Sequence, residues 1–185
     1  MKWMAERYFK DRFNAWGVTP QSVLSTPTPF NVLSWRGIAR DDEHYYVTYW
    51  SLFDAPGRDD SISQFTHGHQ LETDFKESEE YQAIKWFTMG WRKTYQREDE
   101  PDSIYIAALM MGEMRVSNED KTVMKPPFIW KITTSESGFV LERPHKMSKD
   151  IWQSLGDAGN AITVLSERVM GKQEDWMDAE WIWDQ

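Results

Sequence analysis

The stretch NVLSWRGIARDDEHYYVTYWSLF, residues 31–53, is the part of this sequence that most strongly predicts a fold. Two runs rich in β-branched and aromatic residues, 31–39 and 44–53, flank the polar segment RDDE at residues 40–43. This arrangement is typical of a β-hairpin, in which a short polar turn joins two strands. Bulky apolar side chains occupy both alternating sets of positions, so we expect a hairpin that is covered on both faces.

The segment STPTPF, residues 25–30, leads into this hairpin. Proline holds its own φ and pushes the preceding residue away from the helical region. Pro27 and Pro29 therefore predict an extended approach to the sheet that is poor in hydrogen bonds. Within the first strand we expect Asn31 to tie the turn and Trp35 to anchor the core, because a buried indole removes a large apolar area from water.

Apolar residues at helical spacing predict three helices outside the hairpin, over residues 1–16, 72–97 and 148–169. Gly17 stands where a left-handed residue would end the first of them. The apolar stripe of the second helix consists of Tyr81, Ile84, Phe87, Trp91 and Tyr95. The rhythm of the third helix also suits packing against another helix, so a homo-oligomer is one expected arrangement.

Several extended segments complete the chain, with a bend expected at Gly112. They lie at residues 62–65, 103–110, 112–116, 128–133 and 138–142. The order of helix, hairpin, helix, strands and helix predicts an α+β fold, an antiparallel sheet of about five to six strands with helices packed on it. With 185 residues we expect a single soluble domain over 1–185, in which 1–17 is an N-terminal helix and 172–185 an acidic, Trp-rich tail.

Composition excludes several classes of function. The formal charge of −9 predicts repulsion of phosphate backbones, so no nucleic-acid partner is expected. The absence of cysteine removes thiolate catalysis and Cys-based zinc sites. The longest apolar run, IYIAALMM at residues 104–111, is far shorter than the ~20 residues that span a bilayer.

Tryptophan is unusually frequent, with 11 residues in the chain. Three of them, Trp176, Trp181 and Trp183, alternate with acidic residues in the tail QEDWMDAEWIWDQ. Either this tail docks on the body of the protein through its rings, or it is a mobile segment that binds a partner.

The segment His67-Gly68-His69 is the one metal-site candidate in the sequence. Two neutral imidazoles at this spacing, His67 and His69, could hold zinc together with the carboxylate of Glu72 or Asp74. The alternative is a polar turn before a helix, since the histidines stand in no recognised metal-binding frame.

A set of polar and aromatic residues lies on or beside predicted strands and forms the binding-site candidate. Its members are Asn31, Trp35, Arg36, Glu113 and Arg115. An arginine among aromatic rings most often stacks on one of them or pairs with a carboxylate in a structural role. The sequence spells out no nucleophile and base pair and no glycine-rich phosphate loop, so catalytic residues stay unassigned.

The segment TPTPFNVLSWRGIARDDEHYYVTYWSLFD, residues 26–54, resembles the soluble region after the membrane helices in bacterial inner-membrane metal-dependent hydrolase-like proteins, the family that includes the LexA-regulated inner-membrane hydrolases. WFTMGW (86–91), MMGEMRVS (110–117) and PPFIWKI (126–132) are similar to later parts of that region. In this chain Glu113 and Met114 stand where the family usually has Asp and Leu, whereas Arg115 is kept. The resemblance covers roughly residues 2–141 and leaves the Trp-rich C-terminal part unmatched.

The resemblance implies a C-terminal domain with a binding, regulatory or structural role and no complete active site of its own. It implies that a divalent metal would belong to the membrane-embedded N-terminal region, the expected partner, and that this domain holds no cofactor. Positive charge at Lys2, Arg7, Lys10 and Arg12 would place the domain on the cytoplasmic side of the inner membrane. The alternative is a self-contained hydrolase or small-molecule-binding domain with a pocket near Trp35, Arg36 and Arg115.

Overall fold

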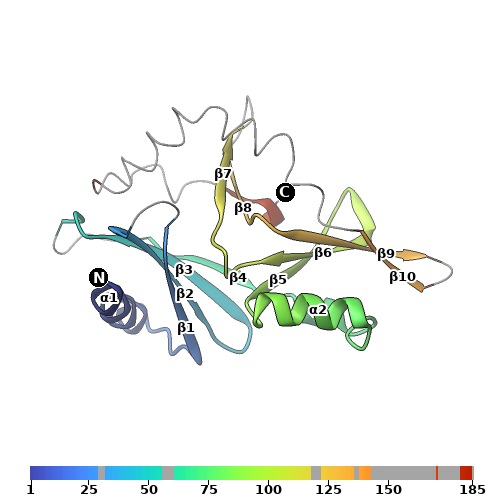
Figure 1. The fold of residues 1–185 in the computed structure, drawn as a ribbon, viewed down its shortest axis with the longest axis horizontal. Helices are drawn as coiled ribbons and strands as arrows, with labels where there is room; N and C mark the ends of the chain where they lie inside the picture. Colours follow the sequence, from blue (N-terminus) through green and yellow to red (C-terminus); the bar gives the residue numbers. More distant parts are fainter. Residues whose placement is uncertain are drawn as a thin grey trace. The chain divides into compact units, whose positions relative to one another are not determined.

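The computed structural model describes residues 1–28, 32–55, 61–117, 122–135, 138–142, 170 and 180–184. Within these residues the chain is mostly β, with two α-helices and eleven strands in three sheets (Figure 1). Contacts divide the chain into two compact units, of which the first contains the described residues up to Thr66 and the second begins at His67. The α+β class is thus confirmed, whereas the expected five to six strands were too few. That the chain forms one domain stays a prediction.

The first unit is a four-stranded antiparallel sheet with one helix on it. Its strands follow chain order: β1 (Ser22–Pro27), β2 (Ser34–Arg40), β3 (His44–Ser51) and β4 (Ser63–Thr66). The predicted hairpin is confirmed as β2 and β3, in which Ile38 lies opposite Val47 and Trp35 opposite Trp50. The extended piece expected near residues 62–65 is confirmed as β4.

The lead-in to the hairpin differs from its prediction, because β1 is extended but pairs with β2 along its whole length. The prolines limit this strand without preventing it: Pro20 lies before its start, and Pro27 is its last residue. Proline lacks a backbone N–H group. At the end of an edge strand this N–H is not required for hydrogen bonding to the neighbouring strand, so proline is tolerated there.

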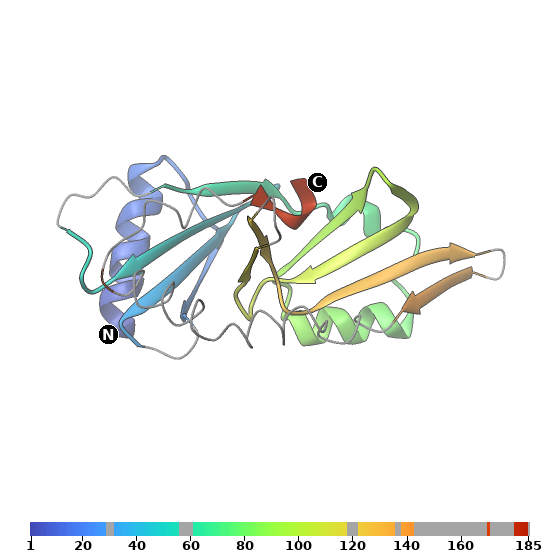
Figure 2. The ribbon, with the colours of Figure 1, turned by 90° about the horizontal axis from the view of Figure 1, so that it is seen from above.

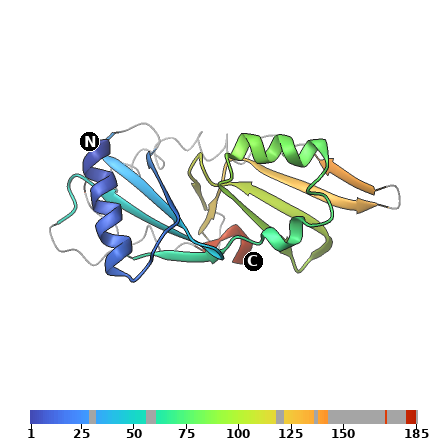
Figure 3. The same cartoon turned by 90° about the horizontal axis from the view of Figure 1, so that it is seen from below.

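Helix α1 (Lys2–Ala15) packs across the sheet of the first unit, as Figure 3 shows. Ala5, Phe9 and Phe13 form its buried stripe against Trp35 and Trp50. The predicted periodicity and helix end are confirmed, since Gly17 has a φ of +73°. On the other face of the sheet Ile38, Tyr45, Val47 and Tyr49 are also buried, which confirms the expectation of two covered faces.

The second unit contains a four-stranded antiparallel sheet in the order β10-β9-β6-β5. Its strands are β5 (Arg92–Arg97), β6 (Glu100–Ala108), β9 (Ile129–Ser135) and β10 (Gly138–Glu142). Helix α2 (Glu79–Thr88) lies along one face of this sheet (Figure 2). Tyr81 and Ile84 of α2 pack with Ile106, Trp130 and Ile132 in a shared core.

A small third sheet also belongs to the second unit. It joins β7 (Met114–Ser117) and β8 (Thr122–Lys125) as an antiparallel pair, and adds β11 (Glu180–Trp181) in parallel to β8. A 3₁₀ turn, η2 (Ile182–Asp184), follows β11 directly. The bend expected at Gly112 is confirmed by its φ of +78°.

The helix predicted over 72–97 is wrong at both ends. A short 3₁₀ turn, η1 (His69–Glu72), precedes α2, and the helix itself ends at Thr88. Met89 and Gly90 take φ values of +48° and +80°, which stop an α-helix. Trp91 and Tyr95 continue the helical spacing only by coincidence, because Tyr95 lies on strand β5. The helix expected over 148–169 lies outside the described residues.

Candidate functional site

Strand β5 brings the main cluster of ionisable groups in the second unit together. The turn η1 approaches β5 closely, because the amide N–H of Thr94 donates to the carbonyl of His67 over 2.8 Å. Gly68 makes this approach possible: it has a φ of +73°, and a Cβ built on it would lie 1.8 Å from the Thr94 carbonyl oxygen. No side chain fits there, so the sequence needs glycine between the two histidines.

Glu72, at the end of η1, is the centre of the cluster and is only 4% exposed. Its carboxylate accepts two hydrogen bonds from Arg92, from Nε at 2.9 Å and from Nη2 at 2.7 Å. The hydroxyls of Tyr81 and Thr94 each donate to it over 2.5 Å. Arg92 Nη2 also donates to the Tyr81 hydroxyl oxygen. The free-energy cost of removing this ion pair from water is therefore offset by hydrogen bonds among the four side chains.

The surroundings shift the pKa values of the cluster. Burial alone raises the pKa of Glu72, but hydrogen bonds from Arg92, Thr94 and Tyr81 outweigh it and hold the pKa below its ordinary value. Burial, together with the hydrogen bond to Glu72, raises the pKa of Tyr81 to about 12. Burial lowers the pKa of His69, and the nearby charges of Arg92 and His67 lower it further against the attraction of Glu72.

The two histidines lie side by side at the edge of this cluster. Their ring centroids are 4.8 Å apart, and His69 Nε2 lies 3.3 Å from the carbonyl oxygen of Arg92. Among the described residues no group of three or more His, Asp or Glu side chains is arranged to hold a metal ion. Glu72, one of the two carboxylates expected to complete a zinc site, is engaged by Arg92, Tyr81 and Thr94. Zinc binding by His67 and His69 stays a prediction.

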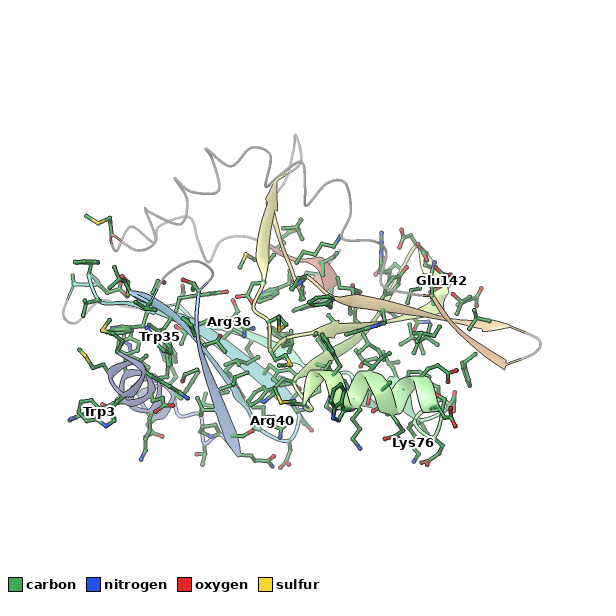
Figure 4. All side chains as sticks on the ribbon, in the orientation of Figure 1. Trp3, Trp35, Arg36, Arg40, Lys76 and Glu142 are labelled. Atoms are coloured by element: carbon green, nitrogen blue, oxygen red, sulfur yellow. The ribbon has the colours of Figure 1, made fainter. Side chains whose placement is uncertain are left out.

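The predicted binding set is divided between the two units. Trp35 is confirmed as a core residue of the first unit: it is buried under α1, and its indole N–H donates to the carbonyl of Val32 over 2.9 Å (Figure 4). Arg36, next to it on β2, is 2% exposed and points to the sheet face opposite α1, across from Tyr49.

The remaining members of the set belong to the second unit or are not described. Glu113 is buried just before β7, and Arg115 lies on β7 opposite Met124 of β8. Asn31 lies outside the described residues. The pocket expected near Trp35, Arg36 and Arg115 stays a prediction.

Exposed apolar residues on α1 form a surface that the sequence reasoning missed. Trp3 is 68% exposed and points away from the sheet, and Met1 and Met4 are exposed beside it (Figure 4). The guanidinium of Arg7 lies 5.9 Å from the centre of the Trp3 ring. A helical wheel could have found this surface, because Trp3, Arg7 and Lys10 fall outside the stripe of Ala5, Phe9 and Phe13.

Comparison of the chain with family models, curated proteins and solved structures finds no match. The resemblance to inner-membrane hydrolase-like proteins therefore stays a prediction. In the described part of the chain, neither α1 nor α2 is long and apolar enough to cross a membrane.

Proposed function

We propose that the chain is a non-catalytic binding domain that binds to the surface of a membrane through the outer face of α1. The observation that carries the proposal is the exposed Trp3, which is bordered by Met1, Met4 and basic side chains. In a protein of the kind the sequence resembles, this domain would bind or regulate, and the chemistry would be carried by the membrane-embedded part.

The outer face of α1 has the composition of an interfacial helix. Tryptophan prefers the boundary between lipid and water, where its ring is apolar and its N–H stays hydrated. Methionine adds flexible apolar area, and lysine and arginine reach toward lipid head groups. The inner face of the same helix is already occupied by the sheet through Phe9 and Phe13, so the outer face is available for a second contact.

Charge favours an anionic lipid surface as the occupant of this face. Helix α1 contains four basic and two acidic residues, in a chain whose formal charge is −9. The helix is therefore a local positive region on an acidic protein. Two of the basic residues are paired within the helix at highly exposed positions, Lys2 with Glu6 over 3.7 Å and Arg7 with Asp11 over 3.9 Å. Four basic minus two acidic residues still leave the helix a net charge of +2. Each basic residue near an anionic membrane contributes about 1 kcal/mol of attraction.

The network around Glu72 in the second unit supports a binding role over a catalytic one. The carboxylate of Glu72 and the guanidinium of Arg92 are paired with each other and with Tyr81. A general acid or base needs a polar atom directed toward a substrate, and this network directs its atoms inward.

Flotation with lipid vesicles tests the proposal. We expect the chain to float with vesicles that contain phosphatidylglycerol and to float poorly with pure phosphatidylcholine, with binding that weakens as salt increases. The variants Trp3→Ala and Lys10→Glu should each reduce binding. The second should reduce it by about thirtyfold, because the reversal changes two charges at about 1 kcal/mol each.

Trp86→Ala is the matched control, because Trp86 is 81% exposed but lies on α2 of the other unit. It should leave vesicle binding unchanged. Equal binding to both kinds of vesicle, or a Trp3→Ala variant that binds as well as the unaltered chain, would show that the outer face of α1 is not a membrane contact.

A further inference from the structure

Residues 180–184, the C-terminal segment, dock on the second unit through a short strand and a turn. Within the described residues the strand pairing covers two positions, with Glu180 opposite Val123 and Trp181 opposite Met124. The turn η2 closes when the amide N–H of Trp181 donates to Asp184 Oδ2 over 3.2 Å. Of the two fates expected for the tail, docking through its rings is the one these residues adopt.

Aromatic rings carry most of this contact. Trp181 stacks on Trp183 with centroids 4.7 Å apart, and Trp183 lies 5.9 Å from Tyr95. Tyr95 in turn stacks on Tyr105 at 5.2 Å. The four rings form a continuous series from the C-terminal segment into the sheet, and Ile182 packs against the same cluster.

Lys93 supplies a charge beside the rings. Strand alternation puts it on the same face of β5 as Tyr95, whereas Arg92 and Thr94 point to the other face and reach Glu72. Lys93 is 7% exposed, and burial lowers its pKa to about 8 while the carboxylate of Asp184 opposes this shift. The amine is therefore close to an acidic side chain of the docked segment.

We propose that Lys93, Tyr95, Tyr105, Val123 and Met124 form a docking site for an acidic peptide that contains tryptophan, and that the chain's own C-terminal segment closes this site. The site offers what such a peptide needs: rings that stack on indole, a buried amine for a carboxylate, and the β8 backbone for strand pairing.

The way the C-terminal segment is attached makes it releasable. Among the described residues of this segment, two pair with β8. Elements held by few backbone bonds open at a lower free energy than the core of a sheet. A tethered segment competes with a free peptide at an effective concentration of about millimolar, so it blocks the site until its own contacts are weakened.

Peptide binding to the 185-residue chain tests the proposal. The probe is a fluorescein-labelled peptide of sequence AEWIWDQ, residues 179–185, followed by fluorescence anisotropy. We expect a double variant, Trp181→Ala with Trp183→Ala, to bind this probe about tenfold or more tightly than the unaltered chain. Adding Lys93→Met to the double variant should weaken binding again, and a probe with alanine at both tryptophan positions should not bind.

Hydrogen exchange on the unaltered chain gives a second measurement that does not depend on the folding of any variant. The amides of residues 181–184 should exchange through openings that leave β5 and β6 protected. The proposal is overturned if a folded double variant binds the probe no better than the unaltered chain, or if residues 181–184 exchange only together with β5 and β6.

Discussion

Two glycines show how single residues control the packing of this chain. Gly37 on β2 lies under α1, where a built Cβ would be 2.5 Å from the ring of Phe9. Gly68 lies under β5, where the built Cβ meets backbone instead of a side chain. A ring can shift by a small amount, whereas a backbone carbonyl group of β5 cannot move without displacing the strand, so the two positions differ in what they tolerate.

Gly68→Ala should lower the free energy of unfolding by more than about 3 kcal/mol, because it adds backbone strain and a clash with the Thr94 carbonyl. Gly17→Ala is the matched control: it has the same φ of +73°, but nothing lies within 4 Å of its built Cβ. The control should lose only the strain, about 1 kcal/mol. Urea denaturation of both variants measures the difference, and equal losses would disprove the role of the close approach.

Trp35→Ala should lower the free energy of unfolding by about 3–5 kcal/mol, because it leaves a cavity between α1 and the sheet. Trp86→Ala removes the same side chain from an exposed position and should change stability by less than about 0.5 kcal/mol. Thermal and urea denaturation provide the comparison. An unchanged melting temperature for Trp35→Ala would contradict its place in the core.

At the scale of elements, strand β5 is the most informative part of the second unit. Its two faces hold different partners, with η1 and α2 on one side and the C-terminal segment on the other. Arg92 and Thr94 connect to Glu72, while Lys93 and Tyr95 face the C-terminal segment. Such a strand is covered on both faces, which explains why its sequence lacks the simple polar and apolar alternation of a half-exposed strand.

The link between η1 and β5 should make stability fall in acid. The folded-state pKa of Glu72 lies below its ordinary value of 4.5, and that of His69 lies below its ordinary value of 6.5. In both cases the unfolded chain binds protons more readily, so stability is fully present above pH 6.5 and is lost as the pH falls through the folded pKa values. Urea midpoints measured from neutral pH downward test this expectation.

The variant Glu72→Gln separates the contribution of Glu72. Leaving Arg92 buried without its carboxylate should lower the free energy of unfolding by about 3–5 kcal/mol at neutral pH. Stability of this variant should also depend less on pH below 4.5, the ordinary pKa of the carboxyl group that the substitution removes. If its acid profile stays parallel to that of the unaltered chain, other carboxylates cause the loss.

For the whole molecule, net charge is the property that most restricts partners. A formal charge of −9 repels any polyanion at distances longer than a single contact. Favourable contact with an anionic surface is therefore confined to local positive regions such as α1.

Labelled double-stranded DNA should show no change in fluorescence anisotropy when the chain is added at low salt, where any electrostatic binding is strongest. A basic protein of similar size provides the positive control. Saturable binding that weakens with added salt would refute the expectation that nucleic acids are not partners.

Part of the architecture was predictable because it depends on local patterns. The helix over Lys2–Ala15 and the hairpin of β2 and β3 followed from apolar spacing and a polar turn within one short stretch. Strand β5 was missed because Trp91 and Tyr95 continue the helical spacing of α2, and β8 because it is short and has polar residues at both ends. The end of α2 was missed because Met89 adopts a conformation that is rare outside glycine.

The sequence by itself determined the α+β class, the first helix, the central hairpin and the acidic character, since each depends on composition or on residues close along the chain. Only the tertiary structure decided that Glu72 pairs with Arg92, 20 residues away, and that Trp181 pairs with Met124 on β8. The physical reason is that these contacts depend on which strand faces meet. The spacing of apolar residues shows which face of a helix or strand is buried. It does not show which distant element covers that face.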